Sequence, residues 1–273
     1  MKFQIIMLSA LIVLTACSSS STGRKQIKLF SSAELDQMGE SSFEEMKKNT
    51  AISQDKATND FVQCVASAIT KNVAKSVHQG DWEVVVFDSA QVNAFALPGG
   101  KIGVYTGILN VTETQDQLGA IIGHEVGHVI EHHSNERLSA NKIQGIGMTA
   151  ATTAAGMVEF ENKDMWMAGL GMGIQYGLIM PYSRSHESEA DIVGQDLMAR
   201  SGFDPKASVK LWQNMAAFSA SSGQTAPAEF MSTHPSNETR IKQLSEHLSV
   251  SMKYYDKNQA PNCVKPKIIP KPA

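Results

Sequence analysis

His124-Glu125-Val126-Gly127-His128 is the stretch of sequence that decides both the fold and the chemistry. It has the form H-E-x-x-H, and apolar residues on both sides of it predict a largely buried helix. Residues four apart share one helical face, so both imidazoles can bind a single zinc ion. Glu125, one position on, can face the water that zinc activates, and it is the expected general base. Because five-residue matches also occur by chance, the third ligand decides the interpretation.

The residues directly after this stretch exclude one class of zinc protease. A metzincin requires glycine at position 131 and histidine at position 134, but the chain has Glu131 and Ser134. His132 continues the four-residue spacing, yet on a straight helix it lies about 12 Å along the axis from His124, too far for one ion. We therefore expect His132 and His133 on the polar face or in support of the ligands.

The downstream segment Ser183–Asp191 offers two carboxylates at helical spacing. Glu187 and Asp191 are four apart and share a face, whereas Glu189 lies nearly opposite. We expect Glu187 to bind the metal and Asp191 to hydrogen-bond a ligand imidazole. Two histidines and one glutamate leave a fourth position open, as catalytic zinc requires. The alternative for this segment is a salt-bridged surface helix.

The composition is that of an ordinary globular protein. The 273 residues are 42% hydrophobic and 19% charged, which suffices for one large domain or two small ones. With 24 Lys+Arg against 27 Asp+Glu the formal charge is −3, so the chain lacks the basic excess that binds phosphates. Nucleic acid is not an expected partner.

The N-terminus has the pattern of a secretory signal. A lysine at position 2 precedes an apolar run that is too short to span a membrane, and Leu14–Cys17 resembles the bacterial lipobox. We expect residues 1–16 to be a signal peptide, Cys17 to carry a lipid, and residues 17–29 to form a tether. No aspartate follows Cys17, which favours the outer membrane, on its periplasmic face. The alternative is an ordinary signal peptide with a buried cysteine.

The other two cysteines, Cys64 and Cys263, are expected to pair. Free thiols are uncommon in an oxidising compartment. Closing a loop of about 200 residues stabilises a fold by about 4–5 kcal/mol on the chain-entropy model.

The remaining pattern predicts an α+β fold that is mainly helical. Trp82–Phe87, Val92–Ala96 and Lys101–Tyr105 read as strands of a small sheet with a tight turn at Pro98-Gly99-Gly100. We expect a domain over residues 30–248 and an extended tail over 249–273. Expected helices cover roughly 31–49, 59–77, 118–137, 183–200, 204–218 and 236–248. The uncharged stretches 143–158 and 165–182 are expected to form a buried helical pair or an active-site cover rather than membrane spans.

Taken together, these motifs resemble the membrane-associated zinc endopeptidases of the HtpX and CAAX-prenyl-protease type, in particular their BepA-like and LoiP-like periplasmic lipoproteins. The resemblance begins at Thr22-Gly23-Arg24 and extends to Leu244. Besides the two ligand motifs, it includes Asn93–Gly100 and Ser232-Thr233-His234-Pro235.

The resemblance implies a zincin-like domain that holds one zinc ion per chain on His124, His128 and Glu187, with Asp191 in support. It implies that Asn93, Ala94, Phe95 and Ala96 form an edge strand beside the cleft, on which substrate backbone pairs. It also implies that His234 approaches the zinc, either to stabilise the transition state or to occupy the open position in a latent state. The alternative for His234 is a cap of the last helix, and Arg240 is a candidate substrate or structural arginine.

The resemblance implies an endopeptidase, tethered to the membrane through Cys17, that cleaves unfolded or misfolded envelope proteins. The outer-membrane assembly machinery is a further candidate partner, although only about 25 residues follow Leu248 and no helical-repeat domain is expected there. The competing hypothesis is a non-catalytic chaperone or binding lipoprotein of the same fold. The intact Glu125 argues against it, because a structural zinc site needs no base.

Overall fold

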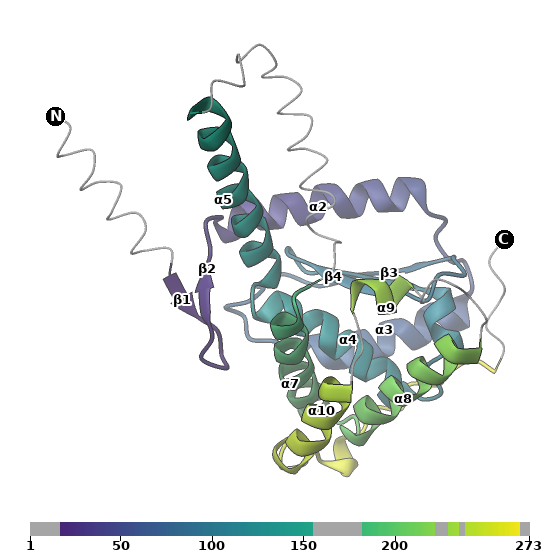
Figure 1. The fold of residues 1–273 in the computed structure, drawn as a ribbon. Coiled ribbons are helices and arrows are strands. Elements are labelled where there is room, and N and C mark those ends of the chain that lie inside the picture. Colours follow the sequence, from purple (N-terminus) through teal and green to yellow (C-terminus); the bar gives the residue numbers. More distant parts are fainter. Residues whose placement is uncertain (1–16, 155–181, 222–228, 235–237, 268–273) are drawn as a thin grey trace.

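A computed structural model describes residues 17–154, 182–221, 229–234 and 238–267 and shows helices packed around a small sheet (Figure 1). The expected α+β fold, mainly helical, is confirmed. The elements are β1 (Cys17–Ser19), β2 (Lys25–Ile27), α2 (Ser32–Asn49), α3 (Lys56–Thr70), β3 (Glu83–Phe87), β4 (Ala94–Leu97), β5 (Lys101–Tyr105), a 3-10 helix (Thr106–Asn110), α4 (Gln115–Ile130), α5 (His133–Ala154), α7 (Arg184–Arg200), α8 (Lys206–Ser221), α9 (Glu229–Thr233), α10 (Glu238–Ser251) and a second 3-10 helix (Lys257–Gln259).

The central sheet separates α2 on one face from α3 and α4 on the other (Figure 1). Its strand order is β3-β5-β4, with β3 parallel and β4 antiparallel to β5. The predicted turn at Pro98-Gly99-Gly100 joins β4 to β5, and Gly99 and Gly100 both adopt positive φ, 81° and 71°. β4 is therefore an edge strand within the described residues.

Apolar side chains fill both sides of the sheet. Phe61 of α3, Ile121 of α4 and Trp212 of α8 belong to the main core, each at most 3% exposed. Phe43 of α2 packs edge-on against Phe87, with ring centroids 6.2 Å apart, on the other face. The sheet is thus fixed between the two layers of helices.

Helices α4 and α7 pack closely because glycine occupies their contact. A Cβ on Gly123 would lie 2.8 Å from the carbonyl oxygen of Gly194, and a Cβ on Gly127 would lie 2.9 Å from that of Ala190. No larger residue fits at these distances without moving a backbone. This approach brings the H-E-x-x-H helix next to the helix that carries Glu187.

The helix expected over 118–137 is in fact two helices. α4 ends at Ile130, and His132 then adopts φ 55°, the only positive φ of a non-glycine residue in the described part of the chain. A residue in this conformation ends a helix and redirects the chain into α5. His133 therefore does not continue the axis of α4, and its ring turns back towards His128.

The segment expected to be a tether forms a hairpin instead. β1 pairs antiparallel with β2, and the turn between them includes Gly23 at φ 88°. The Ser/Thr-rich composition that suggested a flexible segment supplies hydroxyls that bind carboxylates of the body. Ser21, for example, donates its Oγ–H to Glu131 at 2.5 Å.

The predicted disulfide is present and joins Cys64 of α3 to Cys263 in the C-terminal segment. The Cys263 N–H also donates to Gln115 at the start of α4, at 2.8 Å. No helix among the described residues is both long and apolar enough to cross a membrane. The expected helical pair over 143–182 lies mostly outside the described residues, and Ile143, which is described, is 46% exposed.

Candidate metal centre

Four buried side chains from three segments meet at one point. They are His124 and His128 of α4, Glu187 of α7 and His234, which directly follows α9; one ligand atom from each lies within 4.8 Å of the others. Nε2 of His124 is 3.1 Å from Nε2 of His128, and each of these nitrogens is 3.5 Å from an oxygen of Glu187. A tetrahedral zinc with bonds of about 2.0–2.1 Å spaces its ligand atoms about 3.3 Å apart. The cluster therefore has the spacing of a zinc site.

Hydrogen bonds on the far side of each ring fix which nitrogen faces the cluster. Nδ1 of His124 lies 2.9 Å from Oδ1 of Asp191, which only accepts, so this Nδ1 carries the proton. Nδ1 of His128 lies 2.8 Å from Nδ1 of His133, whose Nε2 in turn donates to Glu189 at 2.9 Å. His128 is thus also protonated on Nδ1. The Nε2 atoms of the two rings therefore face each other across 3.1 Å, an arrangement that a cation between them stabilises.

The charge around the cluster also favours a cation. Burial lowers the pKa of His124, but hydrogen bonds with Asp191 and Glu187 outweigh it and raise this pKa to about 9. Burial raises the pKa of Glu187, but the neighbouring His234 and His124 outweigh it and hold this carboxyl ionised. The site therefore favours a positive charge beside Glu187, as zinc would supply.

Glu125 stands beside the ligands and has the properties of a base. Its side chain is buried, and among the described residues its Oε1 accepts no hydrogen bond. Nε2 of His234 lies 3.4 Å from this oxygen. Burial raises the pKa of Glu125, which makes its carboxylate a stronger base.

Arg240 of α10, a candidate substrate or structural arginine from the sequence, holds the carboxylate of Asp191 in place. Its Nε and Nη2 donate to the two oxygens of Asp191 at 2.6 and 2.7 Å, and its Nη1 lies 2.8 Å from Glu187. Its guanidinium also lies over Trp212, 3.9 Å from the ring centroid. Arg240 is 1% exposed, so it is a structural arginine of the metal centre. It is 49 residues from Asp191 in sequence, and no local pattern links the two.

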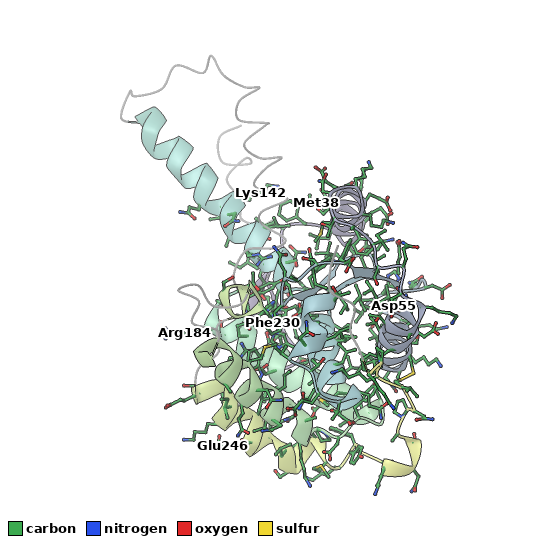
Figure 2. The ribbon with its side chains drawn as sticks, turned by 90° about the vertical axis from the view of Figure 1, so that its right-hand side faces the viewer. Met38, Asp55, Lys142, Arg184, Phe230 and Glu246 are labelled. Atoms are coloured by element: carbon green, nitrogen blue, oxygen red, sulfur yellow. A yellow bond between two sulfur atoms is a disulfide. The ribbon has the colours of Figure 1, made fainter. Side chains whose placement is uncertain are left out.

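His234 lies inside the cluster, as the resemblance implies. Its Nδ1 is 3.1 Å from Oε1 of Glu187 and 3.2 Å from Nε2 of His124. Its ring stacks on that of Phe230, with centroids 4.7 Å apart, and Figure 2 shows Phe230 among the packed side chains inside the molecule. His234 is 4% exposed.

The predicted substrate strand is next to this site. Asn93, Ala94, Phe95 and Ala96 are all buried, and β4 contacts α4. The N–H of Phe230 donates to the carbonyl of Val92 at 2.9 Å, so α9, which precedes His234, is joined to the start of this edge.

Comparison with known proteins agrees with this geometry. The model of Peptidase family M48 matches residues 56–248. The mitochondrial metalloendopeptidase OMA1 of Schizosaccharomyces pombe is 36% identical over 61% of this chain and 47% of its own length. OMA1 of Danio rerio is 33% identical over 82% of this chain and 48% of its own. The beta-barrel assembly-enhancing protease of Yersinia pestis is 26% identical over 75% and 42%. The chain thus spans about half the length of the curated relatives it matches.

The comparison corrects the expected location. Matches at 29–36% identity are named mitochondrial metalloendopeptidases, whereas the bacterial proteases match at 24–26%. The prediction of a bacterial outer-membrane lipoprotein on the periplasmic face is therefore wrong. It depended on the signal pattern of residues 1–17 and on the lack of an aspartate after Cys17, and these few residues specify a compartment less strongly than similarity along the whole domain. Residues 1–16 lie outside the described residues, and the lipid on Cys17 stays a prediction.

Proposed function

The chain belongs to peptidase family M48, and we propose that it acts as an endopeptidase on extended segments of misfolded or damaged proteins. Membership of the family confirms the expected class, zinc-dependent metalloendopeptidase. The carrying observation is the cluster of two histidines and Glu187 at the spacing of zinc ligands, next to Glu125, whose buried Oε1 accepts no hydrogen bond from the described residues.

The residues of the site divide the chemistry among them. Zinc held by His124, His128 and Glu187 would supply a Lewis acid that polarises the scissile carbonyl and makes water more acidic. Glu125 accepts the proton of the attacking water and passes it to the amine that leaves. Its raised pKa suits the first step, because it makes the carboxylate a stronger base than an exposed glutamate. Asp191 keeps His124 in the tautomer that presents Nε2.

The edge of β4 offers a way to bind substrate backbone. The carbonyl of Asn93 accepts from Tyr105 of β5 at 3.1 Å, so antiparallel alternation turns the backbone groups of Ala94 and Ala96 away from β5. The side-chain oxygen of Asn93 accepts a hydrogen bond from the N–H of Ala94 at 2.9 Å. Within the part of the chain that the structure describes, the carbonyl of Ala94 and both groups of Ala96 remain for an added strand. Such pairing reads backbone rather than side chains, which supports a broad range of unfolded substrates.

The position of His234 supports a latent state. Its Nδ1 lies at ligand distance from the other three residues, where it would occupy the position that water needs. A substrate that enters the site would have to displace it.

Glu125→Gln tests the proposed function. This variant keeps the size of the side chain but cannot take a proton. It is expected to bind one zinc per chain and to lose cleavage of a reduced and alkylated test protein by at least about 100-fold. The matched control is Glu45→Gln on the exposed face of α2, which is expected to cleave at the wild-type rate.

Undiminished cleavage by Glu125→Gln would refute the mechanism. A wild-type chain that binds zinc and the unfolded protein but never cleaves it would favour the non-catalytic chaperone instead.

A further inference from the structure

A series of charged and polar groups, buried except for the partly exposed Arg24, leads from the metal ligand His128 to the N-terminal hairpin. Behind His128, the ring of His133 is 0% exposed and donates its Nε2–H to Glu189 at 2.9 Å. Arg24, which precedes β2, donates its Nε and Nη2 to the same oxygen of Glu189 at 3.0 and 2.7 Å. The same guanidinium pairs with Glu136 of α5 at 2.5 and 2.6 Å.

The hairpin surrounds Glu189 with donors. The hydroxyls of Ser20 and Thr22 both donate to Oε1 of Glu189, opposite the oxygen that Arg24 and His133 share. Both oxygens of Glu189 accept from these donors, so His133 must donate from Nε2 and leave Nδ1 free to accept.

The hairpin also holds the junction where α4 ends. Ser21 donates its N–H and its hydroxyl to the two oxygens of Glu131, at 2.9 and 2.5 Å. Gln26, 2% exposed, donates to the backbone carbonyl of Glu131 at 2.6 Å. Glu131 directly precedes His132, whose positive φ turns the chain and sets the ring of His133 behind His128. We call the series Arg24, Glu189, His133 and His128 the relay. The hairpin therefore contacts the relay at Glu189 and also holds the turn that positions His133.

We propose that the hairpin of residues 17–27 is a positioning element of the metal centre, acting through Arg24, Glu189 and His133 on His128. Arg24 holds Glu189, Glu189 fixes the tautomer of His133, and His133 accepts the Nδ1–H of His128. The Nε2 lone pair of His128 is then aimed at the metal with its ring fixed. None of the three residues is a ligand, and each acts through the next.

Zinc affinity tests this inference, which rests on the metal centre of the proposed endopeptidase but needs no substrate. Groups that orient a metal-binding histidine are typically worth about 10–100-fold in metal affinity. His133→Ala and Arg24→Ala are each expected to weaken zinc binding at least 10-fold in competition with a chelator of known affinity. His133→Asn places an amide oxygen near the position of Nδ1, and it is expected to recover much of the loss.

Lys25→Ala is the matched control for the hairpin. It removes a positive charge from the residue next to Arg24, but Lys25 is exposed, so its zinc affinity is expected to stay within twofold of wild type. Thermal melts of the zinc-free proteins separate the two roles, because a merely structural residue would lower the melting temperature and leave the zinc affinity unchanged.

Wild-type zinc affinity in folded His133→Ala and Arg24→Ala would overturn the positioning role. Equal losses in His133→Asn and His133→Ala would overturn the part assigned to the Nδ1 acceptor. If zinc binding depends on the relay as expected while no protein is ever cleaved, the proposed endopeptidase activity fails and the positioning role stands.

Discussion

The contact between α4 and α7 predicts that adding one methyl group at Gly194 will damage the metal centre. In Gly194→Ala the new Cβ would lie 2.7 Å from the carbonyl carbon of Gly123 and from the backbone nitrogen of His124. Both are main-chain atoms of a helix and cannot rotate aside. To lengthen these 2.7 Å contacts to an ordinary 3.4 Å, the two helices would have to move a further 0.7 Å apart.

That separation is large for a metal site. Zinc ligand distances tolerate about 0.2 Å. The shift acts directly between His124 and the helix of Glu187, whose ligand atoms are now 3.5 Å apart. Overpacking costs about 1–3 kcal/mol, and the better helix propensity of alanine offsets up to about 1 kcal/mol of it. We expect a net loss of about 1–2 kcal/mol in the free energy of unfolding and a loss of zinc affinity of at least 10-fold.

Gly145→Ala gives this prediction its control. Gly145 also lies inside a helix, α5, but a Cβ there would meet no atom within 4 Å. The same substitution should therefore stabilise the protein by about 0.5–1 kcal/mol. Denaturant unfolding of the zinc-free proteins, with chelator competition for zinc, measures both effects. If Gly194→Ala is as stable as Gly145→Ala and binds zinc like wild type, the reasoning about this helix contact is refuted.

Three further predictions concern buried charge. Arg240→Leu leaves Asp191 without its cation and should cost about 3–5 kcal/mol in denaturant unfolding, whereas the exposed Lys242→Leu should cost less than about 1 kcal/mol; equal effects would contradict the assigned role. Burial raises the pKa of Glu136, but hydrogen bonds led by Arg24 outweigh it and lower this pKa from 4.5 to about 2. The folded state therefore binds this proton less readily than the unfolded state, and the stability it contributes is present above about pH 4.5 and lost as the pH falls towards 2. With allowance for partial exposure, this contribution is about 1–2 kcal/mol. In the zinc-free protein, Glu136→Gln should make the free energy of unfolding change less steeply with pH in the acid range, and an unchanged pH dependence would contradict this prediction. His234→Ala should raise the basal rate of cleavage if His234 is a latent ligand and lower it if it stabilises the transition state, and an unchanged rate would reject both roles.

Helical spacing was sufficient to predict three of the four clustered residues, and His234 came from the resemblance. Four-residue separations placed His124 with His128 and Glu187 with Asp191, and placed Glu189 on another face, and the structure has each pair converging on the site. Spacing acts within one helix, and local rules can therefore find residues that share a face.

Contacts between distant segments were not predictable in this way. Arg240 reaches Asp191 because α10 packs on α7, and the sequence around it reads as an ordinary amphipathic helix. The break at His132 had no glycine or proline to signal it, so a single helix was expected where two form. The role of Arg24 was not predictable because a Ser/Thr-rich segment suggests a flexible tether. The carboxylates that bind Arg24 are more than 100 residues away in sequence, and only the fold brings them next to it.

Anomalous X-ray scattering at the zinc edge, from crystals of the full chain grown with zinc, tests the central claim most directly. We predict one anomalous peak per chain, within about 2.0–2.2 Å of Nε2 of His124, Nε2 of His128 and a carboxylate oxygen of Glu187. A zinc peak at any other group of residues, or none at this one, would contradict the account.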